Sequence, residues 1–156
     1  MTPAMQTLMR DIARTWDDVV AGLYDRRDTT AAATLLAADV SWTELPTGAG
    51  GTGHGPVLAH LDAVVAALPA GWARARVSRT LDVRRVADEL RFSFMHDREL
   101  PWLLPGVPAT HRPAQVAAVQ LARVRQGRID EVRILWDVAG LCGALGIPGP
   151  GETSCR

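Results

Sequence analysis

The spacing of apolar residues along this chain changes near Trp72, and no other feature limits the possible folds as strongly. Before Trp72 the apolar side chains recur at helical intervals, and after it the helical period is lost and long strand-like stretches follow. Helices that come first, followed by a series of strands, are typical of α+β folds, in which helices cover one face of an antiparallel sheet. The sequence therefore predicts an α+β domain.

Helical segments are expected throughout the first part of the chain. The first spans Met5–Tyr24, where apolar residues recur on one face. A second, shorter helix is capped by Asp-Thr-Thr at 28–30 and extends through Ala37. The third begins at Pro56, and the Pro-Ala-Gly turn at 69–71 closes it.

A strand lies among these helices, and the remaining strands follow them. The early strand covers Asp39–Leu45 and precedes a glycine-rich loop at 48–55. The later strands are expected as two hairpin-like pairs, 73–86 with 89–97 and 114–125 with 128–137. An apolar, proline-rich loop separates the two pairs, and a short helix over 138–146 closes the chain.

Length and composition favour one globular domain. The chain has 156 residues, of which 47% are hydrophobic, enough to build a buried core. We expect a single domain over residues 1–148 and a flexible tail over 149–156. No apolar stretch is long enough to span a bilayer, and the N-terminal segment lacks the charged-then-apolar order of a secretory signal. A cytoplasmic protein without a membrane partner is the expectation.

The charged and metal-binding residue types exclude several functions. Formal net charge is zero with acids and bases interspersed, whereas a nucleic-acid surface needs a concentrated basic face. All 17 basic residues are arginine, which excludes a Schiff-base lysine, a pyridoxal-phosphate anchor and a P-loop of the usual form. The histidines and the two cysteines, Cys142 and Cys155, match no familiar metal spacing. We expect reduced thiols, no metal and no cofactor.

The segment 127–137 combines a turn with a strand that ends on a carboxylate. Alternation gives this strand an apolar face and a charged face. The apolar face consists of Val132, Ile134 and Trp136. The other face carries Glu131, Arg133, Leu135 and Asp137, at positions where a purely structural strand has little use for charge. The charged face is the first candidate for chemistry.

Three motifs together point to a known family. Residues 36–42, Leu-Ala-Ala-Asp-Val-Ser-Trp, form a helix-to-strand entry, and residues 106–113 read G-V-P-A-T-H-R-P. Gly127-Arg128-Ile129 is followed by Asp137 and then by Leu145-Gly146. The order and spacing of these motifs resemble the SnoaL-like polyketide cyclases, in the NTF2-like group that includes ketosteroid isomerase, scytalone dehydratase and limonene epoxide hydrolase.

The resemblance implies a cone-shaped fold, in which a strongly curved sheet wraps around the N-terminal helices and leaves one deep pocket. It also implies that Asp137 occupies the family's catalytic acid/base position. In those enzymes a carboxylate in an apolar cavity removes a proton next to a carbonyl, and the resulting enolate closes a ring without metal or cofactor. Dimers are common in this superfamily, so a homodimer is expected.

The chain departs from the family pattern at three positions. His111 stands where the family usually has Gly in its T-G-R segment. Arg133 replaces a residue that is often aromatic, and Ala144 replaces the usual Gln before Leu-Gly. These differences bear on the substrate and on the reaction.

Asp137 and Arg133 each have more than one interpretation. Asp137 is either the proton carrier or a cap for the closing helix, because Asp before an apolar run is a good N-cap. Burial in an apolar cavity would raise its pKa from about 3.9 toward that of a working general base. Arg133 could pair with Asp137 and lower that pKa, stabilise an enolate, anchor a substrate carboxylate, or pair with Glu131.

The remaining candidates are expected around the pocket. His96 ends a strand, where it is a candidate proton shuttle or, more commonly, a hydrogen-bonded surface group. The loop around Trp102 is either a lid or a patch buried against another subunit. The expected substrate contacts are Tyr24, Trp42, Phe94, Trp102 and His111.

The family resemblance predicts a cofactor-independent cyclase or isomerase that acts on an apolar, polyketide-like intermediate. Asp137 would move the proton, and Arg133 or a histidine such as His96 would support the developing charge. An epoxide hydrolase or dehydratase of the same fold is one alternative, although this chain lacks the Asn that limonene-type hydrolases use beside an Asp-Arg-Asp set. A non-catalytic ligand-binding or partner-binding domain is the other.

Overall fold

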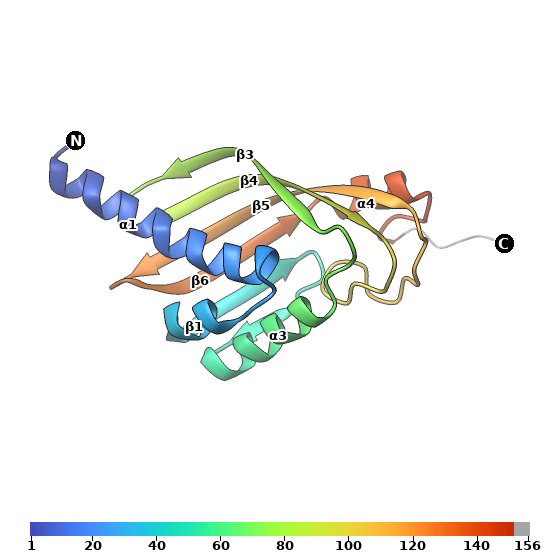
Figure 1. Ribbon diagram of the computed structural model, residues 1–156, viewed down its shortest axis with the longest axis horizontal. Coiled ribbons are helices and arrows are strands. Elements are labelled where there is room, and N and C mark those ends of the chain that lie inside the picture. The colour runs from blue at the N-terminus through green and yellow to red at the C-terminus, as the bar shows by residue number, and fades with distance from the viewer. Residues whose placement is uncertain (152–156) are drawn as a thin grey trace.

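The computed structural model describes residues 1–151 as one mixed α+β unit (Figure 1). Helices alternate with the first strands and the long strands follow. The elements in chain order are α1 (Pro3–Val20), the π-helical turn η1 (Ala21–Asp25), α2 (Thr30–Leu35), β1 (Leu36–Leu45), β2 (Gly50–Thr52), α3 (His54–Ala66), β3 (Ala73–Leu81), β4 (Arg85–Met95), β5 (Pro113–Arg125), β6 (Arg128–Trp136) and α4 (Val138–Leu145).

The strands within residues 1–151 form one curved sheet in the order β2-β1-β6-β5-β4-β3. Neighbouring strands pair antiparallel except β1 and β6, which are parallel and are separated in the chain by α3 and the four strands β2 to β5. Figure 1 shows α1 lying lengthwise across one face of the sheet, α3 beside β1, and α4 at the end away from the N-terminus. The predicted α+β fold, a curved sheet wrapped around N-terminal helices, is confirmed.

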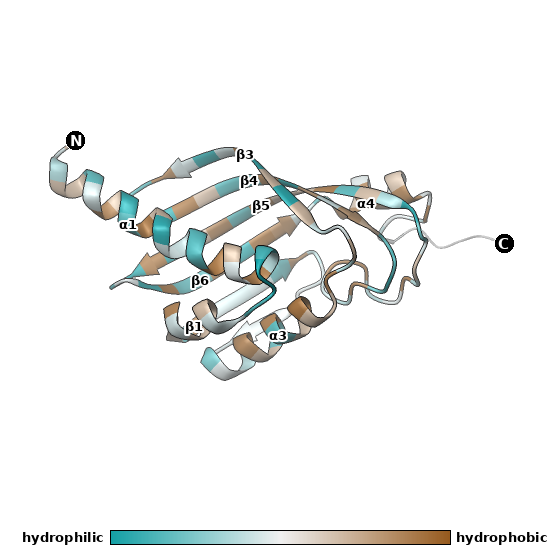
Figure 2. Cartoon of the chain, viewed as in Figure 1, coloured by the Kyte–Doolittle hydropathy of each residue, from teal (hydrophilic) through white to brown (hydrophobic). Residues whose placement is uncertain are grey.

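Helix α1 begins at a sequence-encoded cap and ends in a wider turn. Thr2 accepts a hydrogen bond from the Met5 amide at 3.2 Å, and proline occupies the first helical position. The predicted apolar stripe packs onto the sheet, with Trp16 and Val19 fully enclosed. Figure 2 shows hydrophobic and hydrophilic residues alternating along the helix. At Ala21 the helix continues as the π turn η1, which carries Tyr24 into the interior.

Alternation along the long strands determines which residues face the helices. In β5 every second residue from Ala114 to Val124 is buried, and in β4 every second residue from Val86 to Phe94 is buried. The apolar residues among them form one core with the apolar faces of α1 and α3. The opposite face of the sheet is not covered by any described element and carries most of the strand charges.

The turn between β3 and β4 differs from the expectation. It lies at Asp82–Arg84 and not at Ala87-Asp88, so β3 is shorter and β4 longer than predicted. The Asp82 carboxylate accepts hydrogen bonds from the Arg84 and Arg85 amides at 2.6 and 2.7 Å, which stabilises a turn without glycine or proline. Ala87 and Asp88 pair instead with β3 and β5.

The glycine-rich loop at 48–55 contains a strand that the sequence did not predict. Residues of β2 pair antiparallel with Ser41, Trp42 and Thr43 of β1. Gly50 has a φ of 129°, and a Cβ there would overlap the Trp42 carbonyl oxygen. The close approach of the two backbones therefore requires glycine. Strand β2 forms because its backbone pairs with β1, and its side chains show no alternating apolar pattern.

The membrane and domain expectations concern the chain as a whole. Within residues 1–151, none of the helices has the length and apolar composition needed to cross a membrane. The single domain over residues 1–148 and the flexible tail over 149–156 stay predictions, and most of that tail, including Cys155, lies outside the described residues. Cys142 is buried in α4.

Candidate functional site in the interior of the cone

The charged face of β6 is turned away from the interior. Val132, Ile134 and Trp136 are buried against the helices, whereas Arg133 and Leu135 are exposed on the outer face of the sheet. The separation of the two faces by alternation is confirmed. The charged face, the first candidate for chemistry, therefore lies on the convex side, because the concave side carries the apolar residues that pack on α1 and α3.

Asp137 lies at the junction of β6 and α4, and its carboxylate caps the helix. Its Oδ1 accepts a hydrogen bond from the Gly140 amide at 3.0 Å, and the residue is exposed. The carboxylate occupies the space that a Cβ at position 140 would need, so glycine there is part of the cap. The capping interpretation therefore has a structural basis, while a catalytic role for Asp137 stays a prediction.

Arg133 has no partner near the proposed proton carrier. Among the described residues it makes no ion pair and no side-chain hydrogen bond, either to Asp137 or to Glu131. Glu131 lies instead 3.8 Å from the guanidinium of Arg123. The ion pair considered from the sequence is thus not formed in this structure, and any role of Arg133 toward a substrate stays a prediction.

Glu44 is a carboxylate that lies inside the cone. It is 1% exposed and follows Val40 and Trp42 on the inner side of β1. Its Oε1 accepts a hydrogen bond from Trp42 Nε1 at 3.1 Å, and its Oε2 accepts one from Trp136 Nε1 at 2.7 Å. A buried carboxylate is costly unless donors compensate for the lost water, and the two indoles provide that compensation.

His60 supplies a third contact to the same carboxylate. It projects from α3, and its Nε2 lies 3.2 Å from Glu44 Oε1. The imidazole is nearly buried, with 11% of its side chain exposed. When Nε2 carries the proton and donates to Glu44, Nδ1 is left as an acceptor, and no described residue donates to it. A carboxylate that orients a histidine in this way is the usual arrangement of a general base and its supporting group.

Gln120 lies on the same cross-strand row as Glu44. Glu44 pairs with Ile134, and Ile134 pairs with Gln120, so two strand spacings, about 10 Å, separate the carboxylate from the amide. Gln120 is fully buried, and neither its Oε1 nor its Nε2 has a hydrogen-bond partner within residues 1–151. Buried polar atoms without partners are rare, and this amide therefore offers hydrogen bonds that a ligand could satisfy.

Tyr24 reaches into the same space from the π turn. Burial raises the pKa of its hydroxyl well above the usual value, and the nearby charge of Glu44 raises it further, whereas Arg74 and the Gln120 amide lower it. Gln120 influences the hydroxyl without meeting ordinary hydrogen-bond geometry. Tyr24 therefore stays protonated and can donate a hydrogen bond to an oxygen that becomes negative.

Aromatic side chains form the wall around these polar groups. Trp72 is central, and its ring centroid lies 5.0 to 6.4 Å from those of its aromatic neighbours. The indole nitrogens of Trp72 and Trp102 are buried and unpartnered within the described chain. These rings fill the space predicted to be one deep pocket. The rings packed around Trp72 are Tyr24, Phe92, Phe94, Trp102 and Trp136.

His96 lies inside the cone, as its alternation with Phe92 and Phe94 indicates. It is fully buried, and its Nδ1 is 3.2 Å from the Thr110 amide and 2.9 Å from the Thr110 hydroxyl. The amide can only donate, so Nδ1 is the acceptor and Nε2 carries the proton. Burial lowers the pKa of His96, and the charge of Asp97 opposes that shift. Nε2 has no partner among the described residues, so this neutral imidazole is a further unused donor.

The residues expected to contact substrate do not all lie in the interior. Tyr24, Trp42, Phe94 and Trp102 are buried in the interior, whereas His111 is exposed. The Trp102 loop packs into its own chain, where Thr47 donates a hydrogen bond to the Trp102 carbonyl at 2.9 Å. Within residues 1–151, no three or more His, Cys, Asp or Glu side chains gather as a metal site.

The sequence of residues 10–145 matches the family model of the SnoaL-like polyketide cyclases. The chain belongs to this family. Among curated proteins no sequence matches it. The predicted resemblance is thereby confirmed, and it extends over most of the chain.

Solved structures of SnoaL-like and related proteins have the same fold. A candidate SnoaL-like polyketide cyclase from Jannaschia sp. CCS1 has a TM-score of 0.71 and 16% identity, covering 95% of this chain and 97% of the other. IdmH, a candidate polyketide cyclase from Streptomyces antibioticus, has a TM-score of 0.64 and 23% identity, covering 84% and 98%. An LEH-like epoxide hydrolase from M. tuberculosis has a TM-score of 0.63 and 15% identity, covering 92% of each chain.

The position of His111 explains one departure from the SnoaL-like pattern. Its backbone has a φ of 54°, in the left-handed region that glycine adopts without cost. The family's Gly in the T-G-R segment suits this conformation, and His111 keeps it while its amide donates to the His96 carbonyl at 2.9 Å. Arg112, the Arg of that segment, donates to the Leu145 carbonyl at the end of α4.

Sequence reasoning missed Glu44, His60 and Gln120, although each leaves a signal. Glu44 continues the inner alternation of Val40 and Trp42 in β1. Gln120 interrupts a run of small and apolar residues on the inner side of β5. His60 is one residue before the buried Leu61 of α3. In each case a polar side chain occupies a position that periodicity assigns to the core, which is a stronger signal than charge on a solvated face.

Proposed function

We propose that this protein is a cofactor-independent cyclase or isomerase that moves a proton next to a carbonyl group of a flat, apolar, polyketide-like substrate. The observation that carries the proposal is the pairing of His60 with the buried Glu44 inside an aromatic enclosure. Membership of the SnoaL-like family supports the general reaction class.

The three donors on Glu44 differ in what they can do. The indole N–H groups of Trp42 and Trp136 do not titrate in water, so they hold the carboxylate in place. The imidazole of His60 has a second ring nitrogen, which can accept a proton while Nε2 donates to Glu44. His60 is therefore proposed as the general base, with Glu44 orienting it and stabilising the imidazolium after it has taken a proton.

The electron pair left by that proton moves onto the carbonyl oxygen. We assign hydrogen-bond donation to this oxygen to the protonated Tyr24, together with the unpartnered amide of Gln120. His96 offers a further neutral donor through Nε2. In an isomerisation His60 returns the proton to another carbon. In a cyclisation the enolate carbon attacks a second carbonyl, a carbon–carbon bond forms, and the new alkoxide takes the proton.

Substrate must displace side chains to reach these groups. The buried rings of Trp72 and Trp102 lie 6.3 Å apart, and Trp102 belongs to the loop that follows β4. We therefore infer that the Trp102 loop moves outward when substrate enters, and that the two indole N–H groups then donate to substrate oxygens. This uses the lid interpretation of the loop.

Exchange of α-protons tests the proposal without knowledge of the true substrate. A flat ketone such as 2-tetralone is dissolved in D₂O buffer, and loss of its α-proton signal is followed by NMR. The wild-type protein is expected to accelerate exchange, and Glu44→Gln and His60→Gln to reduce the acceleration by about 10² or more. Glu89→Gln, on the outer face of β4, is the matched control and keeps the wild-type rate.

Two outcomes would redirect the assignment. Unchanged exchange in both variants would remove Glu44 and His60 from the reaction. Binding of flat ketones without any acceleration would favour the non-catalytic ligand-binding alternative. A separate assay tests the epoxide hydrolase alternative, in which Glu44 and His60 would deprotonate water. The wild type would then hydrolyse limonene oxide without exchanging ketone protons, and His60→Gln would lose the hydrolysis.

We also propose that the protein is a homodimer formed through the outer face of the sheet. Val119 and Leu135 are register partners on β5 and β6, and they are 39% and 40% exposed. Light scattering is expected to give the mass of a dimer for the wild type and of a monomer for Val119→Asp. Leu8→Asp changes a similarly exposed residue on α1 and keeps the dimer. A dimeric Val119→Asp would place the interface elsewhere.

A further inference from the structure

The apolar stripe of α1 continues beyond the part of the helix that the sheet covers. Ile12 is 3% exposed, whereas Leu8 and Met5, one and two turns nearer the N-terminus on the same side, are 46% and 43% exposed. In Figure 1 the N-terminal end of α1 projects past the tips of the strands. Two turns of an amphipathic helix therefore present apolar side chains without a covering element among the described residues.

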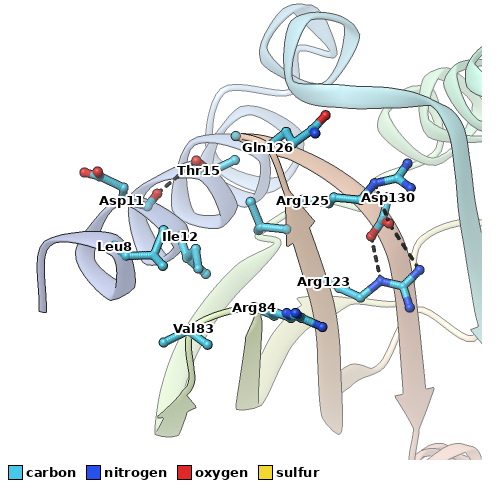
Figure 3. A pocket seen from close by; sticks show the side chains of 12 residues that line it. Leu8, Asp11, Ile12, Thr15, Val83, Arg84, Arg123, Arg125, Gln126 and Asp130 are labelled. Atoms are coloured by element: carbon cyan, nitrogen blue, oxygen red, sulfur yellow. Dashed lines mark hydrogen bonds and ion pairs between the residues drawn. The ribbon is translucent and has the colours of Figure 1, made fainter. Parts of the chain in front are cut away.

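A groove of about 690 Å³ lies beside these two turns. Leu8 and Ile12 of α1 form one side, and Val83 in the turn between β3 and β4 forms another (Figure 3). The hairpin turn at Gln126 closes a third side. This volume lies in the range of small-molecule sites, about 300–1,000 Å³. The groove is separate from the proposed reaction site, because neither Glu44 nor His60 lines it.

Arginines line the groove on the side of the sheet. Arg123 and Arg125 both contact the buried carboxylate of Asp130, at 2.8 and 3.3 Å, and each has a second acidic neighbour, Glu131 at 3.8 Å and Asp39 at 2.9 Å respectively. Arg84 is exposed and makes no ion pair or side-chain hydrogen bond within residues 1–151. Figure 3 shows the Asp11 carboxylate on the far side of α1 from these arginines. Because Arg123 and Arg125 are already paired with acids, an anionic group in the groove would find its available positive charge on Arg84.

We propose that this groove is a second binding site, which takes an amphiphilic carboxylate with a linear apolar chain. The chain lies against Leu8, Ile12 and Val83, and the carboxylate accepts hydrogen bonds from Arg84. A cationic amphiphile of the same length is repelled by Arg84, and a short carboxylate lacks the apolar contact. The site does not depend on the reaction proposed for the interior.

Decanoate, below its micelle concentration, is the probe. Binding to the isotope-labelled protein is followed by NMR, with decylammonium and acetate as matched ligands. Decanoate is expected to shift the amide signals of Leu8, Val83 and Gln126 and to leave the indole signals of Trp72 and Trp102 unchanged. Arg84→Ala and Leu8→Ser are each expected to weaken binding about tenfold, the loss of one charge-assisted hydrogen bond or one apolar contact.

Arg91→Ala is the control variant. Arg91 is also exposed and without an ion pair among the described residues, but it projects from the outer face of β4. Its affinity for decanoate is expected to equal that of the wild type. The proposal is overturned if decylammonium binds as tightly as decanoate, if the shifts centre on Trp72 and Trp102, or if Arg84→Ala and Leu8→Ser bind like the wild type.

Discussion

His60 Nε2 and Glu44 Oε1 lie 3.2 Å apart, and this contact joins α3 to the buried end of β1. Trp42 and Trp136 donate to the same carboxylate from β1 and β6, so groups on three elements determine its position. A carboxylate held in this way cannot turn to follow a substrate. Of these three donors only the histidine also has an acceptor nitrogen, so it alone can take a proton from a substrate.

Replacement of Glu44 by alanine should destabilise the fold strongly. The Trp42 and Trp136 indole N–H groups and the His60 imidazole would each lose an acceptor in a buried place. We expect the free energy of unfolding to fall by about 3–5 kcal/mol, measured by denaturant titration. Glu89→Ala, which removes a carboxylate from the outer face, should change it by no more than about 0.5 kcal/mol. Equal losses in the two variants would show that the buried contacts contribute little.

Tyr24 can be titrated alone, because it is the only tyrosine and the chain has no lysine. Burial, assisted by the charge of Glu44, holds the pKa of its hydroxyl well above 10. The folded protein should therefore show no tyrosinate absorbance as the pH passes 10. Above that pH the unfolded chain releases a proton that the folded chain keeps, so the free energy of unfolding falls as pH rises, and Tyr24→Phe removes this part of the fall. A tyrosinate signal at pH 10 in the folded protein would contradict the burial of the hydroxyl.

His96 should remain neutral at pH values where an exposed histidine is protonated. Burial lowers its pKa, so below about pH 6.5 the unfolded chain binds a proton that the folded chain does not. The free energy of unfolding is expected to fall as pH decreases through this window. His96→Asn keeps an acceptor for Thr110 and should remove that component. NMR should find Nε2 protonated and Nδ1 unprotonated in the folded wild type, and the reverse tautomer would contradict the contact with the Thr110 amide.

The periodic elements of the fold could be predicted because their signals are local. The α1 stripe and the alternation of β5 each follow from side chains of one segment. The turn at Asp82 could not, because a side-chain cap replaces the usual glycine or proline. Strand β2 depends on backbone pairing with a distant segment, to which its glycine-rich sequence contributes no apolar pattern.

The candidate site was harder to predict than the fold. Alternation separated the two faces of β6 correctly. It does not tell which face points to the interior, and Arg133 lies exposed on the outer face. Glu44 and His60 come from elements whose apolar residues dominate their pattern, and only the packing of α3 on β1 brings the pair together. The tautomer of His96 depends on Thr110, fourteen positions away, and no local pattern encodes it.

Asp137 is the residue at which the role implied by the family and the role seen in the structure differ most. The family pattern assigns proton transfer to Asp137, whereas its carboxylate caps α4 from an exposed position. Asn is as good an N-cap as Asp, and its side-chain oxygen can still accept from the Gly140 amide. Asp137→Asn therefore removes the acid/base group and keeps the helix. Asp137→Ala should in addition lower the free energy of unfolding by about 1 kcal/mol.

If His60 and Glu44 move the proton, Asp137→Asn should exchange the α-protons of 2-tetralone at the wild-type rate, while His60→Gln loses about 10² or more of the acceleration. Circular dichroism and the unfolding curve establish that both variants are folded. The opposite pattern, an inactive Asp137→Asn beside an active His60→Gln, would return the reaction to the end of β6. The buried pair would then be structural, because a base must come within hydrogen-bond reach of the proton that it removes.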